Sequence, residues 1–153
     1  MAEEEQPDQV TSLLVPMQGR PWLIPNILVA EVIGLRQPER SGSGGPQWLL
    51  GWLNWRDVDV PLISFEAMNE AGQPQIGQDA RIVVLNTISG KNRFYAMVIQ
   101  GIPRTVKVES EDLVEEPVDT GPVEAMSVQV GGDLAVMPDL DAIEDQVAEL
   151  NAP

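Results

Sequence analysis

Frequent turn-forming residues constrain this chain more than any other feature of its sequence. The 153 residues include 13 glycines and 13 prolines, which separate short runs rich in branched aliphatic side chains. Both residue types disfavour helix interiors, whereas short aliphatic runs bounded by turn residues are typical of strands. The pattern predicts a mainly β protein whose length fits one domain, or two small halves that share a core.

The aliphatic runs define the expected strands and the loops between them. The expected strands cover residues 11–17, 20–25, 27–35, 48–55, 58–64, 81–87, 93–101, 105–108, 126–130 and 133–138. A hairpin is expected around Gly19, and a second one around Gly131 and Gly132. Residues 36–47 are expected to form a loop, because they are rich in Gly, Ser and Pro.

Two helical segments are expected, one after each of two hairpins. Residues 65–70 suit a single helical turn, and residues 139–150 suit a longer helix with Asp139 as its N-cap. The longer segment places its apolar side chains on one stripe, which comprises Leu140, Ile143, Val147 and Leu150. We expect one domain over residues 11–150, with a flexible acidic tail at 1–10 and a short tail at 151–153.

Residues 48–66, WLLGWLNWRDVDVPLISFE, hold three of the four tryptophans. Their spacing would suit one face of a helix, but Gly51 and Pro61 oppose a helix here. We therefore predict two strands that turn at Arg56 and Asp57, since Asp tolerates the left-handed conformation of tight turns. Neighbouring side chains alternate along a strand, so at least one tryptophan is expected at a surface.

The order of expected elements repeats along the chain. Residues 51–68 and 126–143 each run strand, tight turn, strand, helix, and residues 11–35 and 81–108 each run strand, turn, strand, strand. This repetition predicts two β subdomains of similar plan.

The net charge of −15 limits the classes of partner. Nucleic acid and anionic membrane surfaces are disfavoured, because both are bound through Lys and Arg. The acids concentrate in residues 3–8, 109–119 and 139–149, which suits either solvated edges or a positively charged partner. No apolar run is long enough to span a bilayer and no signal peptide is visible, so we expect a cytoplasmic protein without membrane insertion.

The usual catalytic chemistry is absent from the sequence. The chain has no histidine and no cysteine, which removes the commonest general base, nucleophile partner and metal ligands. Asp119-Thr120-Gly121 matches the signature of retroviral-type aspartic proteases, but it sits in an acidic, proline-flanked segment where a turn is the better interpretation. We expect no enzymatic activity, no cofactor and no metal.

Four segments in order resemble the CheW family of chemotaxis adaptors. The central segment LLGWLNWRDVDVPLISFE is similar to the family signature at Gly51, Leu53, Asn54, Arg56 and Pro61. Residues 23–34, 94–108 and 133–144 resemble three further family segments, so the likeness covers about residues 11–150. The chain departs from the family pattern at Asp57, where the turn glycine is usual, and at Gln100 and Pro138.

The resemblance implies two small five-stranded β-barrels, of SH3- or OB-like type, that share a core. It also implies an adaptor that joins methyl-accepting chemoreceptors to a CheA-type histidine kinase. The segments PNILVAEVIG, GWLNWRD and PLISFE are most similar to adaptors of systems that govern type IV pili and twitching motility. The alternative is a generic protein-binding β-barrel outside chemosensing.

The resemblance also implies where partners bind. Strands 27–34 and 94–102 would flank a groove in which a receptor helix contacts apolar side chains. The expected contact residues are Val29, Glu31, Trp52, Asn54, Trp55, Arg56, Asp57, Ile99 and Ile102. Each apolar member could equally belong to the core, and Arg56 could equally make a bond within its own turn.

Overall fold

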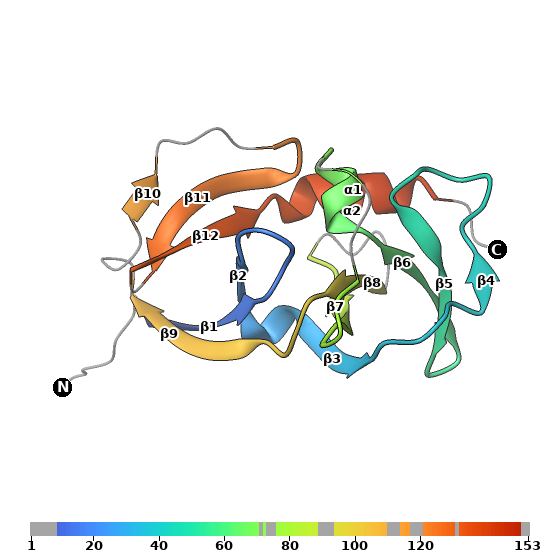
Figure 1. Ribbon diagram of the computed structural model, residues 1–153, viewed down its shortest axis with the longest axis horizontal. Helices are drawn as coiled ribbons and strands as arrows, with labels where there is room; N and C mark the ends of the chain where they lie inside the picture. Colours follow the sequence, from blue (N-terminus) through green and yellow to red (C-terminus); the bar gives the residue numbers. More distant parts are fainter. Residues whose placement is uncertain are drawn as a thin grey trace.

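The computed structural model describes residues 9–70, 72, 76–88, 94–109, 114–116, 121–130 and 132–150. These residues form two six-stranded sheets, which lie on opposite sides of Figure 1. The first sheet has the strand order β10 (Val114–Glu116), β11 (Glu124–Val130), β12 (Asp133–Pro138), β2 (Trp22–Pro25), β1 (Gln9–Val15) and β9 (Arg104–Glu109). The second has the order β3 (Val29–Gly34), β7 (Arg81–Asn86), β8 (Phe94–Ile99), β6 (Val58–Ile63), β5 (Leu49–Trp55) and β4 (Arg40–Ser41).

The two sheets have one plan. In each, an antiparallel hairpin joins a second antiparallel pair through a parallel contact, β12 with β2 in the first sheet and β6 with β8 in the second. The edge strands are exchanged between the sheets. Strand β3 follows the β1–β2 hairpin in sequence but pairs with β7, and β9 follows the β7–β8 hairpin but pairs with β1. The predicted pair of β subdomains of similar plan is confirmed, and this strand exchange intertwines them.

The strand number differs from the five expected in each subdomain. The short strands β4 and β10 add a sixth strand at one edge of each sheet, within segments that the sequence indicates to be a loop and an acidic connection. Two- and three-residue strands carry no periodic pattern by which a sequence could show them. Within the described residues the backbone pairing of each sheet is open rather than closed into a barrel.

The helices follow the two hairpins as predicted. Helix α1 (Phe65–Met68) follows β5–β6, and α2 (Leu140–Ala148) follows β11–β12; a short 3₁₀ turn, η1 (Asn26–Leu28), precedes β3. The Asp139 carboxylate caps α2 by accepting the N–H of Ala142 at 3.0 Å. Strand β1 begins at Gln9, two residues before the first expected strand at 11–17.

One core joins the two sheets. Its largest cluster contains Trp22 from the first sheet, Ile63 and Tyr95 from the second, Phe65 from α1 and Ile143 from α2. The rings of Trp22 and Phe65 meet edge to face, with 4.8 Å between their centroids. Each sheet also has a smaller cluster of its own. Burial across both sheets therefore couples the subdomains into one folding unit.

Candidate functional site

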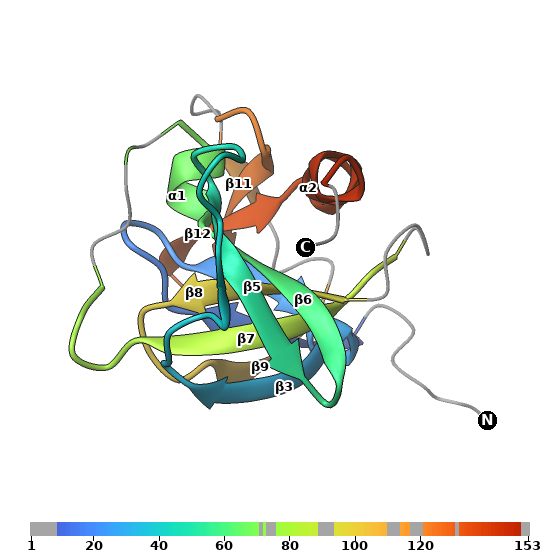
Figure 2. The same ribbon diagram turned by 90° about the vertical axis from the view of Figure 1, so that its right-hand side faces the viewer.

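The turn between β5 and β6 presents the central residues of the expected site. Arg56 and Asp57 both have positive φ angles, 50° and 65°, as a two-residue turn between right-twisted strands requires. The turn predicted from sequence is therefore confirmed at these two positions. The twist of the sheet brings the hairpin tip beside β3, as Figure 2 shows.

Glu31 of β3 connects to this tip through one oxygen. Its Oε1 accepts the indole N–H of Trp55 at 2.9 Å and a guanidinium N–H of Arg56 at 3.2 Å. The Arg56 guanidinium lies 4.6 Å from the centroid of the Trp55 ring, which is a cation–π distance. We call Glu31, Asn54, Trp55 and Arg56 the Glu31–Arg56 site.

The backbone of the same site is held by the loop after β3. Asn54 donates its N–H to the Glu39 carboxylate at 2.8 Å, and its carbonyl oxygen accepts from Arg36 at 2.6 Å. The Asn54 N–H lowers the pKa of Glu39, because it stabilises the ionised carboxylate. These contacts bridge the two ends of the second sheet through side chains, although the backbone pairing stays open.

The Glu31–Arg56 site combines charge with an apolar margin. It borders a hollow of about 620 Å³ that Ile33 and Leu35 also line. The Arg56 side chain is 66% exposed, so guanidinium donors face solvent while the Trp55 ring supports them. The arrangement suits recognition of a carboxylate beside apolar side chains on a partner surface.

The structure brings five of the nine expected contact residues together. Glu31, Asn54, Trp55, Arg56 and Asp57 share the hairpin tip and β3. Asn54, Arg56 and Asp57 are exposed, whereas Trp55 is 7% exposed and packs edge to face on Phe94. Trp55 therefore acts mainly as the support of Arg56.

The remaining expected residues lie elsewhere. Ile99 is fully buried in the shared core, which is the alternative that the sequence left open for it; β8 is an inner strand whose side chains are buried on both faces. Strand β7 also separates β3 from β8. Val29 is half-buried against the shared core. Ile102 is 68% exposed beside a separate hollow of about 370 Å³ at the β1–β2 hairpin.

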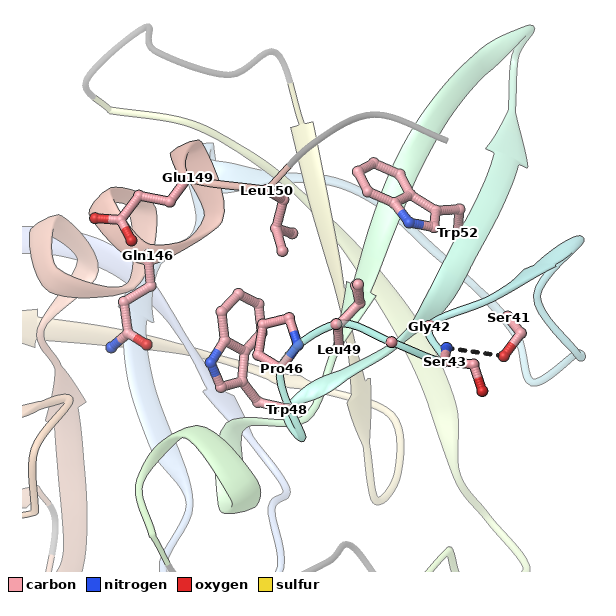
Figure 3. Close-up of a pocket in the computed structure, with 12 residues that line it drawn as sticks. Ser41, Gly42, Ser43, Pro46, Trp48, Leu49, Trp52, Gln146, Glu149 and Leu150 are labelled. Atoms are coloured by element: carbon pink, nitrogen blue, oxygen red, sulfur yellow. Dashed lines mark hydrogen bonds between the residues drawn. The ribbon is translucent and has the colours of Figure 1, made fainter.

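Trp52 belongs to a feature that sequence reasoning missed. Its indole and the half-buried Trp48 line a hollow of about 650 Å³ between β5, the loop before it and the end of α2 (Figure 3). Trp48 is thus the tryptophan of this segment most accessible to solvent. The glycine-rich stretch SGSGGP directly before the tryptophans is the signal that could have indicated it.

The described residues contain no group of three or more acidic side chains placed to hold a metal ion. None of the described helices is long and apolar enough to cross a bilayer. Asp119 and Thr120 of the protease-like match lie outside the described residues, whereas Gly121 donates its N–H to Glu124 at 2.8 Å.

The fold is one of two intertwined β subdomains, and Glu31, Trp55 and Arg56 form a partly exposed polar cluster at the tip of the β5–β6 hairpin. The CheW-like domain model matches residues 11–147, and the chain belongs to that family. It is similar to the crystal structure of the scaffolding protein TtCheW from Thermoanaerobacter tengcongensis, with a TM-score of 0.71 and 12% identity over 84% of this chain and 88% of that chain. No curated protein matches the chain.

Proposed function

We propose that the protein is a non-enzymatic chemosensory adaptor that couples methyl-accepting chemoreceptors to a CheA-type histidine kinase in the cytoplasm. Membership of the CheW-like domain family supports an adaptor role. The observation that carries the proposal is the assembly of Glu31, Trp55 and Arg56 from two distant segments into one exposed site.

The geometry of the site suits an adaptor, which acts by binding alone. Glu31 holds Arg56 against Trp55 before any partner arrives, so less side-chain freedom is lost on binding. The outward face of the guanidinium then engages a carboxylate of a receptor helix, while Ile33 and Leu35, which line the hollow beside the site, contact its apolar residues. The segments PNILVAEVIG and GWLNWRD support assignment to the type IV pilus and twitching branch.

The test measures binding of a purified receptor signalling fragment and of a CheA-type kinase, each alone, to the wild-type protein and to Arg56→Ala. We expect the variant to weaken receptor binding by roughly tenfold, as for an arginine hot spot. Arg40→Ala is the matched control, because Arg40 is also exposed on the second sheet but lies outside the Glu31–Arg56 site.

Three outcomes would contradict the proposal in whole or in part. Wild-type protein that binds neither fragment would instead favour a protein-binding β module outside chemosensing. Receptor binding reduced equally by Arg56→Ala and Arg40→Ala would reflect general charge and not this site. A kinase that binds while the receptor does not would leave only half of the coupling function.

A further inference from the structure

A second surface feature lies between the glycine-rich loop and the C-terminal helix. We call it the tryptophan groove; its main walls are Pro46, Trp48, Trp52, Gln146, Glu149 and Leu150. Figure 3 shows Leu150 directed between the two indoles, with Gln146 and Glu149 on the helix side. None of these residues belongs to the Glu31–Arg56 site.

The loop wall of the groove is rigidly built. Gly42 passes so close to β5 that an added Cβ would lie 2.3 Å from the Leu49 carbonyl oxygen, and Gly44 has a φ of +89°. Two backbone bonds close the loop, Gly45 N–H to Gly42 at 3.0 Å and Leu49 N–H to Pro46 at 3.1 Å. The Trp48 carbonyl accepts the N–H of Ser64 at 2.8 Å. The groove is therefore formed before any ligand binds.

The side of the groove formed by the end of α2 carries negative charge. The described last turn of α2 carries no basic residue, so its carbonyl dipoles are not neutralised from within the helix. Glu149, the C-cap residue, is exposed at the groove and adds a full charge. No lysine or arginine is among the described residues that line the groove. A cation is the ligand that satisfies both the helix end and Glu149.

The aromatic walls favour a particular cation. A guanidinium stacks on indole faces and also bonds a carboxylate in its own plane, whereas an ammonium is more strongly hydrated. The same chain already uses this pairing, because Arg56 lies over Trp55 beside the Glu31 carboxylate. Leu49, Leu150 and Pro46 supply apolar surface for the methylene stem of such a side chain.

We propose that the tryptophan groove binds an arginine side chain presented by a segment of a partner protein, with the guanidinium over the half-buried Trp48 indole on the Glu149 side of the groove. The charge of the chain, −15, supports a basic protein segment as the occupant. This surface is separate from the Glu31–Arg56 site, so both can be occupied at once. The proposal holds whether or not the partners of that site are chemoreceptors.

The test is a titration with the capped peptide Gly-Leu-Arg-Leu-Gly, followed by the indole N–H resonances of the full chain. Trp48→Phe and Trp52→Phe assign the two signals. A second peptide replaces arginine by citrulline, which keeps the shape and removes the charge. We expect the arginine peptide to shift the Trp48 and Trp52 signals and to bind about tenfold more tightly than the citrulline peptide.

A matched pair of variants tests the helix wall. Glu149→Gln should weaken the arginine peptide by roughly two- to fivefold. Asp141→Asn removes the same charge from the exposed first turn of α2, away from the groove, and should leave the affinity unchanged. Equal affinity for the two peptides, equal effects of the two variants, or no shift of either indole at millimolar peptide would overturn the proposal.

Discussion

Glu31 stabilises two neighbours of different kinds. One is the indole N–H of Trp55, which is 7% exposed, and the other is the guanidinium of Arg56, which is 66% exposed. An unpaired N–H in a nearly buried ring retains a desolvation penalty, whereas an exposed ion pair contributes little to folding because water screens it. The structural role of Glu31 therefore lies with Trp55, and its positioning role lies with Arg56.

These roles can be separated by two substitutions. Glu31→Ala should lower the free energy of unfolding by about 1–2 kcal/mol, because it leaves the Trp55 N–H without its acceptor. Arg56→Ala should lower it by less than about 0.5 kcal/mol. Urea unfolding followed by tryptophan fluorescence measures both. A larger stability loss for Arg56→Ala than for Glu31→Ala would show that the cation, and not the indole bond, stabilises this end of the sheet.

At the scale of the element, the β5–β6 hairpin carries a strained turn. Asp57 has a φ of 65°, a conformation that glycine adopts without steric cost and other L-residues adopt less readily. The CheW-like pattern has glycine at this position. The strain is tolerated because the strands on either side are fixed, Trp55 opposite Val58 and Leu53 opposite Val60.

Replacing this residue tests the strain directly. Asp57→Gly should raise the free energy of unfolding by about 0.5–1 kcal/mol, because steric relief exceeds the added flexibility of the unfolded chain. Asp59→Gly, at an exposed position of β6 two residues on, should lower it by about 0.5–1 kcal/mol. Thermal unfolding measures both variants. A loss of stability in Asp57→Gly would mean that the aspartate side chain stabilises the turn by more than the strain costs.

At the scale of the molecule, polar contacts cross between the subdomains beside the shared core. Glu66 of α1, which is 4% exposed, accepts the N–H of Gln18 from the β1–β2 turn at 3.2 Å. Asn69 accepts the N–H of Val123 at 3.1 Å and donates to Glu124 at 2.8 Å. Glu66 and Asn69, both from the second subdomain, thus form hydrogen bonds with backbone and side-chain groups of the first.

The Glu66 contact makes stability depend on pH. Burial raises the pKa of its carboxyl above the ordinary 4.5, and Oε1 has no hydrogen-bond partner among the described residues. Between about pH 4.5 and the raised pKa, the folded state binds more protons than the unfolded state. The contribution of Glu66 to stability therefore falls as the pH rises through this range. Glu66→Gln removes the charge and keeps an acceptor for Gln18.

We expect Glu66→Gln to be more stable than the wild type by about 1 kcal/mol at pH 7, with the difference shrinking toward zero below about pH 4.5. Urea unfolding from pH 4 to pH 8 measures the difference. Glu70→Gln is the control for removing an acid beside α1, because Glu70 is exposed just after that helix. A difference independent of pH would mean that Glu66 has the same protonation state in the folded and unfolded chain.

The sequence by itself determined the features that depend on neighbouring residues. The turn at Arg56 and Asp57, the Asp139 cap and the apolar stripe of α2 follow from local backbone preferences and spacing. The repeated order of strands and helices indicated two similar subdomains for the same reason. Together these local patterns, with the family resemblance, were sufficient to predict the fold.

Only the tertiary structure decided which segments meet. The exchange of β3 and β9 between hairpins, the pairing of Glu31 with Trp55 from 24 residues away, the burial of Ile99 and the hollow beside Trp48 depend on sheet twist and on how two sheets share one core. An aliphatic residue in a strand has the same local pattern on either face. Which face becomes core is decided by long-range packing, because the free energy comes from apolar area buried between distant segments.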